Sequence, residues 1–184
     1  MLLASLSNTK LFLEIQVATH DTLLSLLLAQ ISKRVETFLN RDLEKKARTV
    51  YYDAGRKLYF LSAYPIDSTA ILTVIDETTT RIINSDYYVW YDEGLIDFYT
   101  IPTYNRPKQI AITWTGGYVN TNAVPGDIQL AVIMQTAFVF RRRKDIGLTS
   151  ISMPDGSISV NAPTELLPEV KAVLKSYRKT PGGK

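Results

Sequence analysis

Apolar and polar residues follow two different periods along the chain of 184 residues. Near the start, apolar positions recur every three or four residues, which is the spacing of a helix with one buried face. This spacing predicts a helix over residues 21–39, with Thr19 or Asp21 as its N-terminal cap. A shorter helix is expected before it, capped within Ser7-Asn8-Thr9. The apolar stripe of the longer helix consists of Leu24, Leu28, Ile31, Val35 and Phe38.

The middle of the chain has the period of two that is typical of strands. Residues 46–120 contain five or six short runs rich in aromatic and β-branched residues, separated by turn residues. Ala54-Gly55-Arg56 predicts a hairpin between the first two runs, and Asp92-Glu93-Gly94 predicts a second tight turn. We therefore expect a small antiparallel sheet or a barrel-like sandwich. Its last strand alternates Ile110, Ile112 and Trp114 and ends at Gly116-Gly117.

The helical period returns in residues 124–144. Pro125 and Asp127 suit the first turn of a helix, and the residues that follow are apolar almost all round, which is typical of a buried core helix. This helix ends in four consecutive cations, Arg141, Arg142, Arg143 and Lys144.

Two shorter elements are expected after this helix. Residues 145–162 alternate in a period of two on both sides of Pro154-Asp155-Gly156, which predicts a projecting hairpin arm. Residues 163–180 predict an amphipathic helix that begins near Pro168, and residues 181–184 a frayed tail.

These elements together predict a single α+β domain over residues 1–180. We expect it to be mainly a bundle of three or four helices, with an inserted small antiparallel β-sheet or hairpin region. Its parts are N-terminal helices in 1–45, a β-rich insertion in 46–120, the core helix in 124–144, the arm in 145–162 and the C-terminal helix in 163–180.

Charge is unevenly distributed along the chain. The net charge is +3, but residues 1–140 hold 12 Lys and Arg against 14 Asp and Glu, a net of −2. Residues 141–184 hold 9 against 4, a net of +5. This asymmetry indicates a polyanion or an acidic protein as the partner of the C-terminal quarter.

Residues with catalytic or metal-binding chemistry are scarce. The chain has no cysteine and one histidine, His20, which excludes thiolate chemistry and leaves too few ligands for a structural zinc site. The carboxylates Asp92, Glu93 and Asp97 cluster at a predicted turn, and they are explained by turn chemistry. We therefore expect no enzyme, no cofactor and no metal.

The apolar runs are short. The longest uncharged run, residues 128–140, is below the roughly 20 residues that cross a bilayer, and no basic leader precedes the first apolar residues. We expect a soluble protein that is made in the cytoplasm and has no membrane partner.

Six segments of the chain occur in a recognisable order: "DTLLSLLLAQISKRVETFLNRDL", "YPIDSTAILTVID", "YYVWYDEGLIDF", "IAITWTGGYVN", "VPGDIQLAVIMQTAFVFRRR" and "LLPEVKAVLKSYR". The ordered set resembles the head–tail connector proteins of long-tailed bacteriophages, also called adaptor or head-completion proteins, with relatives in gene transfer agents. The pattern T-G-G-Y, followed by V-P-x-D-I and a buried helix with a basic end, carries most of the resemblance.

The resemblance implies a structural role in the virion, at the head–tail junction. Such proteins form a ring, usually of about twelve subunits, beneath the portal vertex. The ring extends the DNA tunnel and provides the platform for stopper and tail. The implied partners are the portal protein, a stopper or tail-completion protein, further copies of the chain, and packaged double-stranded DNA that passes through without sequence-specific contacts. The C-terminal segment docks on the portal in this family, which makes Lys175, Tyr177, Arg178 and Lys179 candidates for that contact.

Several interpretations of the charged and extended segments stay open. The cations 141–144 form a helix cap and solvated surface, pair with an acidic neighbour, or line the DNA tunnel; a tunnel that lets DNA slide argues against all four facing it. The arm is either a surface hairpin of its own domain or a segment that pairs with a neighbouring subunit. Two other functions remain alternatives: a different neck protein (stopper or tail completion), and a DNA-binding packaging factor. The candidate arm residues are Ser150, Ile151, Met153, Pro154, Asp155, Gly156 and Ile158.

Overall fold

The computed structural model describes residues 1–143, 150–153, 156–159 and 165–178. The chain divides into two compact units, which are treated separately below. The helical unit comprises residues 1–40 and 121–184, and the β-unit comprises residues 41–120. The second unit is therefore inserted in the sequence of the first.

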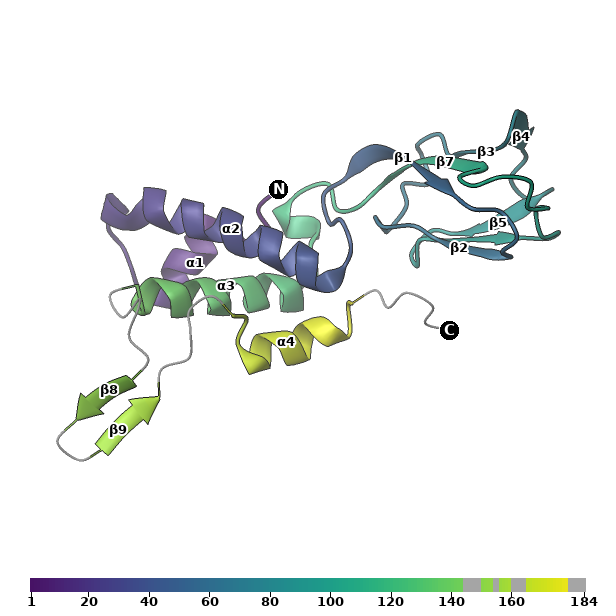
Figure 1. Cartoon of the computed structure of the whole chain (residues 1–184). Helices are drawn as coiled ribbons and strands as arrows, with labels where there is room; N and C mark the ends of the chain where they lie inside the picture. Colours follow the sequence, from purple (N-terminus) through teal and green to yellow (C-terminus); the bar gives the residue numbers. More distant parts are fainter. Residues whose placement is uncertain (144–149, 154–155, 160–164, 179–184) are drawn as a thin grey trace. The chain divides into compact units, whose positions relative to one another are not determined.

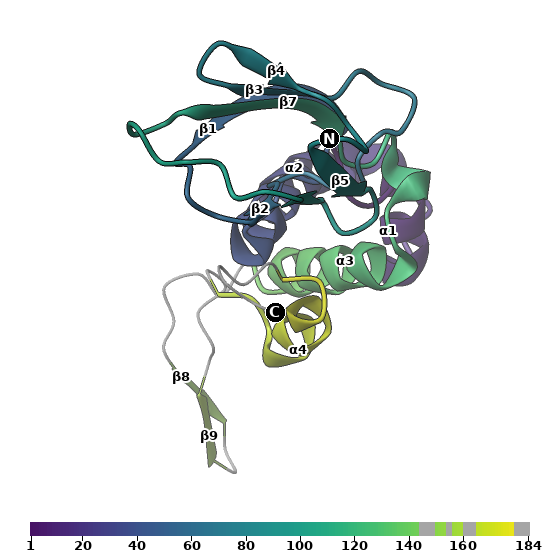
Figure 2. The ribbon, with the colours of Figure 1, turned by 90° about the vertical axis from the view of Figure 1, so that its right-hand side faces the viewer.

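The helical unit contains the helices α1 (Leu6–Leu13), η1 (Ala18–His20), α2 (Asp21–Leu39), η2 (Thr121–Ala123), α3 (Gly126–Arg141) and α4 (Pro168–Lys175). Helix α3 packs between α2 and α4 (Figures 1 and 2), and α1 packs against α2 and α3. The range of α2 is the one that the apolar spacing predicts, and Leu24, Leu28, Ile31 and Val35 are buried in it. Phe38 is only half-buried, and Leu39 takes the last core position instead.

Both predicted helix caps are wrong. The first helix is capped by Ser5, whose side chain accepts a hydrogen bond from the Asn8 backbone N–H at 3.1 Å. Helix α2 follows directly on η1 with His20 in the cap position, and its side chain makes no capping hydrogen bond. Asp21 lies in the first turn instead and forms an ion pair of 2.7 Å with Lys10. This pair joins α1 to the start of α2.

The β-unit holds seven strands in two antiparallel sheets. One sheet has the order β1 (Lys46–Tyr52), β7 (Ile110–Gly116), β3 (Thr73–Asp76), β4 (Thr79–Arg81). The other has the order β2 (Leu58–Phe60), β6 (Leu95–Phe98), β5 (Tyr87–Trp90). Both sheets contribute to one core, in which the largest fully buried side chains include Trp114, Tyr59, Tyr87 and Phe98.

Buried and half-exposed residues alternate along β7, the last strand of the β-unit. Ile110, Ile112 and Trp114 are buried while the residues between them are half-exposed, as the alternation predicts. The indole N–H of Trp114 donates to the Ala63 carbonyl at 2.9 Å, so the polar atom of this buried ring is satisfied.

The predicted fold class and the first predicted hairpin need correction. A β-unit of 80 residues with seven strands makes this a mixed α+β fold and not mainly a helical bundle. The turn at Ala54-Gly55-Arg56 joins β1 to β2, but these strands do not pair: β1 pairs with β7 and β2 pairs with β6. The turn chemistry is present, since Gly55 has φ +86°, yet the strands that it joins enter different sheets.

The two ends of the β-unit lie side by side. The Tyr118 backbone N–H donates to the Leu43 carbonyl at 2.7 Å, and the Lys45 N–H donates to the Tyr118 carbonyl at 2.9 Å. The glycine pair Gly116-Gly117 makes this approach feasible. A Cβ on Gly116 would lie 2.4 Å from the Ala63 oxygen, and one on Gly117, at φ +106°, would lie 2.6 Å from the Glu44 backbone.

Candidate assembly surfaces

Three of the four predicted cations lie in the described part of the chain, at the end of α3. Arg141 is the last residue of the helix and is exposed, and the Arg142 backbone N–H donates to the Phe138 carbonyl at 3.0 Å. The Arg142 guanidinium lies 5.5 Å from the centre of the Phe138 ring. The Arg143 guanidinium lies 4.1 Å from the centre of the Phe140 ring and donates to the Phe140 carbonyl. Lys144 lies outside the described residues.

These contacts divide the cationic cluster into two kinds of residue. Arg142 and Arg143 close the C-terminus of α3, where cations complement the helix dipole and stack on aromatic rings. Arg141 is the exposed member of the described three and extends over an adjacent cleft. The sequence alone gives these arginines no distinguishing feature.

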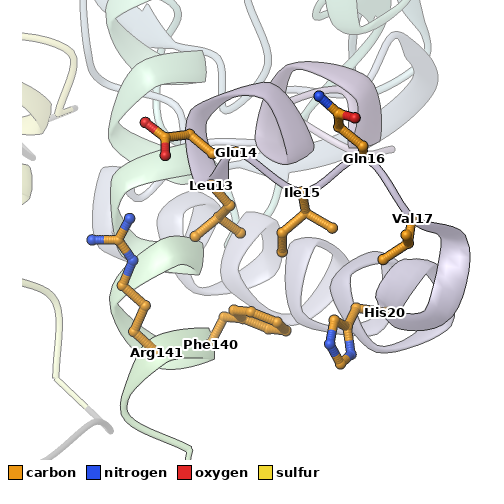
Figure 3. Close-up of a pocket in the computed structure, with 8 residues that line it drawn as sticks. All are labelled: Leu13, Glu14, Ile15, Gln16, Val17, His20, Phe140 and Arg141. Atoms are coloured by element: carbon orange, nitrogen blue, oxygen red, sulfur yellow. The ribbon is translucent and has the colours of Figure 1, made fainter.

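The cleft has a volume of about 550 Å³ and lies between α1, η1 and the end of α3 (Figure 3). Its apolar lining comes from Leu13, Ile15, Val17 and Phe140. The His20 ring packs edge-on against Phe140, with 5.3 Å between the ring centres. Polar side chains complete the lining, namely Glu14, Gln16, His20 and Arg141.

The predicted arm is described through its backbone in two strands, β8 (Ser150–Met153) and β9 (Gly156–Ser159). They form an antiparallel pair that joins no other described strand of the chain. The register places Ser150 opposite Ser159, Ile151 opposite Ile158, and Met153 opposite Gly156. Pro154 and Asp155 lie outside the described residues.

The C-terminal candidates are attached to the helical unit in the described part of the chain. The Tyr177 hydroxyl donates to an Asp127 carboxylate oxygen at 3.0 Å, and the Arg178 guanidinium lies 5.3 Å from the centre of the Phe38 ring. Lys175 is the exposed last residue of α4. Lys179 lies outside the described residues. Tyr177 and Arg178 thus already make contacts that hold the end of α4 against α2 and α3.

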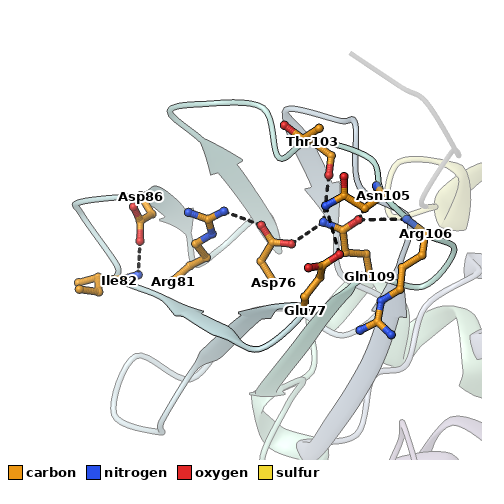
Figure 4. Close-up of polar contacts among 9 residues, drawn as sticks. All are labelled: Asp76, Glu77, Arg81, Ile82, Asp86, Thr103, Asn105, Arg106 and Gln109. Carbon is orange, nitrogen blue, oxygen red and sulfur yellow. Dashed lines mark hydrogen bonds and ion pairs between the residues drawn. The ribbon is translucent and has the colours of Figure 1, made fainter.

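Buried polar residues fix the loops of the β-unit (Figure 4). Asp76 is buried, and it lies between Arg81, at 2.5 Å, and the side-chain amide of Gln109, which donates to it at 2.7 Å. The same amide donates to the Thr103 carbonyl at 2.9 Å, while the Gln109 side-chain oxygen accepts from the Asn105 N–H at 2.9 Å. The network joins β3 and β4 to the loop before β7, so its role is structural.

Perturbed ionisation in the β-unit has structural causes. Hydrogen bonds from Lys45 and then from Thr69 lower the pKa of Asp67 to about 2. Burial raises the pKa of Tyr87 to about 12, with smaller contributions from Tyr91 and Asp86. Burial also raises the pKa of Tyr52 and of Tyr59.

The predicted carboxylate cluster is a turn. Asp92 and Glu93 are exposed between β5 and β6, Gly94 has φ +65°, and Asp97 lies 3.7 Å from the Lys57 amine. Among the described residues, no group of three or more His, Cys, Asp or Glu side chains is arranged to hold a metal ion.

No single helix in the described ranges has both the length and the apolar composition of a membrane span. Helix α1 and the segment η1–α2 meet that test only as a pair, and they are bent by 118° from each other.

Sequence reasoning missed one surface, the outward side of the β2–β6–β5 sheet. Tyr88, Trp90 and Leu58 are 45%, 47% and 40% exposed there. The signal was present in "YYVW", where large apolar residues occupy both the inward and the outward positions of one strand. Such a run also fits a strand buried on both sides, so the sequence alone could not identify the surface as exposed.

The described residues thus present exposed cationic and aromatic side chains and a separate two-stranded hairpin. The chain belongs to the head completion protein family, whose model matches residues 2–180. The expected family is therefore confirmed, and the membership gives the chain a structural role in head completion.

Solved structures show the same fold at low identity. A chain in the neck of an empty gene transfer agent particle, computed with C6 symmetry, has 18% identity and a TM-score of 0.62 over 97% of this chain and 91% of that chain. A chain in the virion of a native gene transfer agent particle has 19% identity and a TM-score of 0.58, covering 91% and 83%. A chain in a native neck computed with C12 symmetry has 19% identity and a TM-score of 0.51, covering 90% and 86%. No curated protein matches the sequence.

Proposed function

We propose that the chain is a connector subunit at the neck of a phage-like particle, where it joins the DNA-filled head to the tail. The observation that carries this proposal is the family match over residues 2–180, because head completion is a neck function. The shared fold with chains from particle necks supports the same location.

The subunits form a closed ring, and twelve copies are the number that we propose. One of the necks with the shared fold was computed with C12 symmetry, which supports this count. A closed ring uses head-to-tail contacts, so each subunit contributes two different surface patches. The ring extends the tunnel beneath the portal protein and offers its other side to a stopper or tail-completion protein.

Three segments are candidates for these contacts. The C-terminal segment with Lys175, Tyr177, Arg178 and Lys179 docks on the portal. The β8–β9 arm pairs with a neighbouring subunit, since an isolated two-stranded hairpin is marginally stable and has unpaired edges. The cations at the end of α3 contact protein more than DNA, because two of the described three already stack on rings of their own helix.

Electron microscopy of purified particles, labelled with a gold-tagged antibody against this chain, tests the location. Label confined to the head–tail junction is expected. Label on the capsid faces, at the tail tip, or nowhere on the particle would overturn the proposal.

A second candidate function, DNA binding, is favoured by the net charge of +5 in residues 141–184. This function requires an affinity for DNA that falls steeply as the salt concentration rises. Replacing Arg141, Arg142 and Arg143 must then make the affinity less dependent on salt. A flat titration at low salt would exclude it.

A further inference from the structure

The outward side of the β2–β6–β5 sheet has the composition of a covered surface. Its six positions are called the aromatic face below, and they are Leu58, Phe60, Tyr88, Trp90, Leu95 and Asp97. The register aligns Phe60, Leu95 and Trp90 in one row across the three strands, and Leu58, Asp97 and Tyr88 in the next. Tyr88 and Trp90 also touch each other edge-on, with 5.4 Å between the ring centres. Five of the six residues are therefore apolar or aromatic.

The other sheet of the same unit provides an internal comparison. Threonine holds five of the nine outward positions of that sheet, and the others are Ala47, Tyr51, Ala111 and Ile75. The hydroxyls of Thr49 and Thr113 share a hydrogen bond of 2.8 Å. Antiparallel sheets with one side in water normally carry polar residues on that side. Polar residues hold five of the nine outward positions of the β1–β7–β3–β4 sheet, but only one of the six positions of the aromatic face. Because both sheets enclose the same core, the core gives no reason for the difference, and we attribute it to a partner.

Three carboxylates lie in or beside the aromatic face. Asp92 and Glu93 are exposed in the turn that directly follows Trp90, and Asp97 lies within the face. Two exposed cations, Arg56 and Lys57, precede Leu58 in the chain, and Lys57 pairs with Asp97 at 3.7 Å. Aromatic rings beside carboxylates attract guanidinium groups, which stack on the rings and pair with the acids.

Stacking of arginine on aromatic rings recurs within this chain. The Arg41 guanidinium lies 3.4 Å from the centre of the Tyr64 ring, and Arg143 lies 4.1 Å from that of Phe140. Exposed Arg141 is the last residue of α3 and belongs to the quarter of the chain with a net charge of +5. The chain thus carries both an acidic aromatic surface and a basic segment that fits it.

We propose that the aromatic face receives the Arg141–Arg143 end of α3 from a second copy of this chain. Trp90 and Tyr88 offer ring surfaces, and Asp92 and Glu93 pair with the incoming guanidinium groups. The contact joins two different patches and is therefore head-to-tail, as a closed ring requires. This inference rests on the proposed ring, and it names which surfaces meet.

Photo-crosslinking tests the contact directly. A photoactivatable phenylalanine is introduced at position 90, and unlabelled protein is mixed with ¹⁵N-labelled protein at high concentration before illumination. Mass spectrometry is expected to find mixed-isotope cross-links from position 90 to the peptide that contains residues 138–143. The same probe at position 104 is the control, because Tyr104 is also exposed in the β-unit, at 54%. Cross-links confined to one chain, cross-links to another surface, or none would overturn the proposal.

A charge exchange provides the second test. The variant Asp92→Lys/Glu93→Lys and the variant Arg141→Glu each change exposed residues only, and Gly94 of the turn is kept. Each is expected to lower the cross-link yield about fivefold, and a chain that carries all three changes is expected to regain it. A combined chain as weak as its parents would overturn the pairing. If gold label still marks the neck while this contact fails, the proposed function stands and only the assigned surfaces are wrong.

Discussion

The side chain of Gln135 is fully buried in α3 and accepts a hydrogen bond from the Leu167 backbone N–H at 2.8 Å. The same side chain donates to the Glu165 carbonyl at 3.0 Å. One side-chain amide thus binds two backbone groups in the segment that leads into α4, and one of them belongs to Leu167, which directly precedes the helix. The start of α4 has no side-chain cap of its own, and this amide contributes to holding it on α3.

Replacing Gln135 by Leu is expected to destabilise the protein by about 1 kcal/mol, since two part-buried backbone groups lose their hydrogen-bond partner. Urea unfolding followed by circular dichroism measures the change. Gln30→Leu is the matched control, because Gln30 is exposed on α2. Equal stability of the two variants would contradict the role of Gln135.

The glycine pair after β7 is expected to tolerate no side chain. Gly116→Ala and Gly117→Ala each place a Cβ within 2.6 Å of backbone atoms, so each is expected to cost about 3 kcal/mol or to prevent folding. Gly126→Ala is the control, because a Cβ at that position meets nothing within 4 Å. Thermal unfolding of the three variants separates the cases. A Gly117→Ala variant as stable as Gly126→Ala would show that the strand ends do not need this close approach.

The ion pair of Asp67 with Lys45, 2.7 Å long, is expected to make stability depend on acidity at low pH. The folded-state pKa of Asp67, about 2, lies below its ordinary value of 3.8. The pair therefore stabilises the fold fully above pH 3.8, and this contribution disappears as the pH falls towards 2. Asp67→Asn is expected to be less stable than the parent at pH 6 and to converge with it near pH 2. Denaturation curves across this range test the sign; a constant difference would exclude the linkage.

The arginines at the end of α3 are expected to differ in their effect on stability. Arg143→Ala removes a ring contact and a bond to a terminal carbonyl, and we expect a loss of about 1 kcal/mol. Arg141→Ala changes an exposed side chain and is expected to stay within about 0.5 kcal/mol of the parent. Chemical denaturation of both variants provides the measurement. Equal losses would mean that the cluster acts as one undivided cap.

Periodicity predicted the elements that are buried on one side. Helix α2 and strand β7 follow it because the positions that face a core are set by 3.6 and 2 residues per repeat. The pairing of β1 was not predictable in this way. Its partner β7 begins at Ile110, more than fifty residues away, and the glycine turn at Gly55 describes only the local path of the chain.

The candidate surfaces were predictable to a different degree. The charge of residues 141–144 is evident in the sequence, but the ring contacts that separate Arg143 from Arg141 depend on the geometry of a helix end. The aromatic face was missed because Trp90 and Val89 look alike in hydropathy although they point to opposite sides of the sheet. The balance between helices and strands was also misjudged, because a β-unit of 80 residues was taken for a small insertion.

The paired ends of the β-unit have a consequence for how such a protein diversifies. Leu43 and Tyr118 are hydrogen-bonded neighbours, so the chain enters the β-unit and leaves it at adjacent positions. A unit whose two ends are adjacent can be lengthened, exchanged or deleted, because the flanking chain then needs to be joined at one place only. The helices and the sheets can therefore change at independent rates.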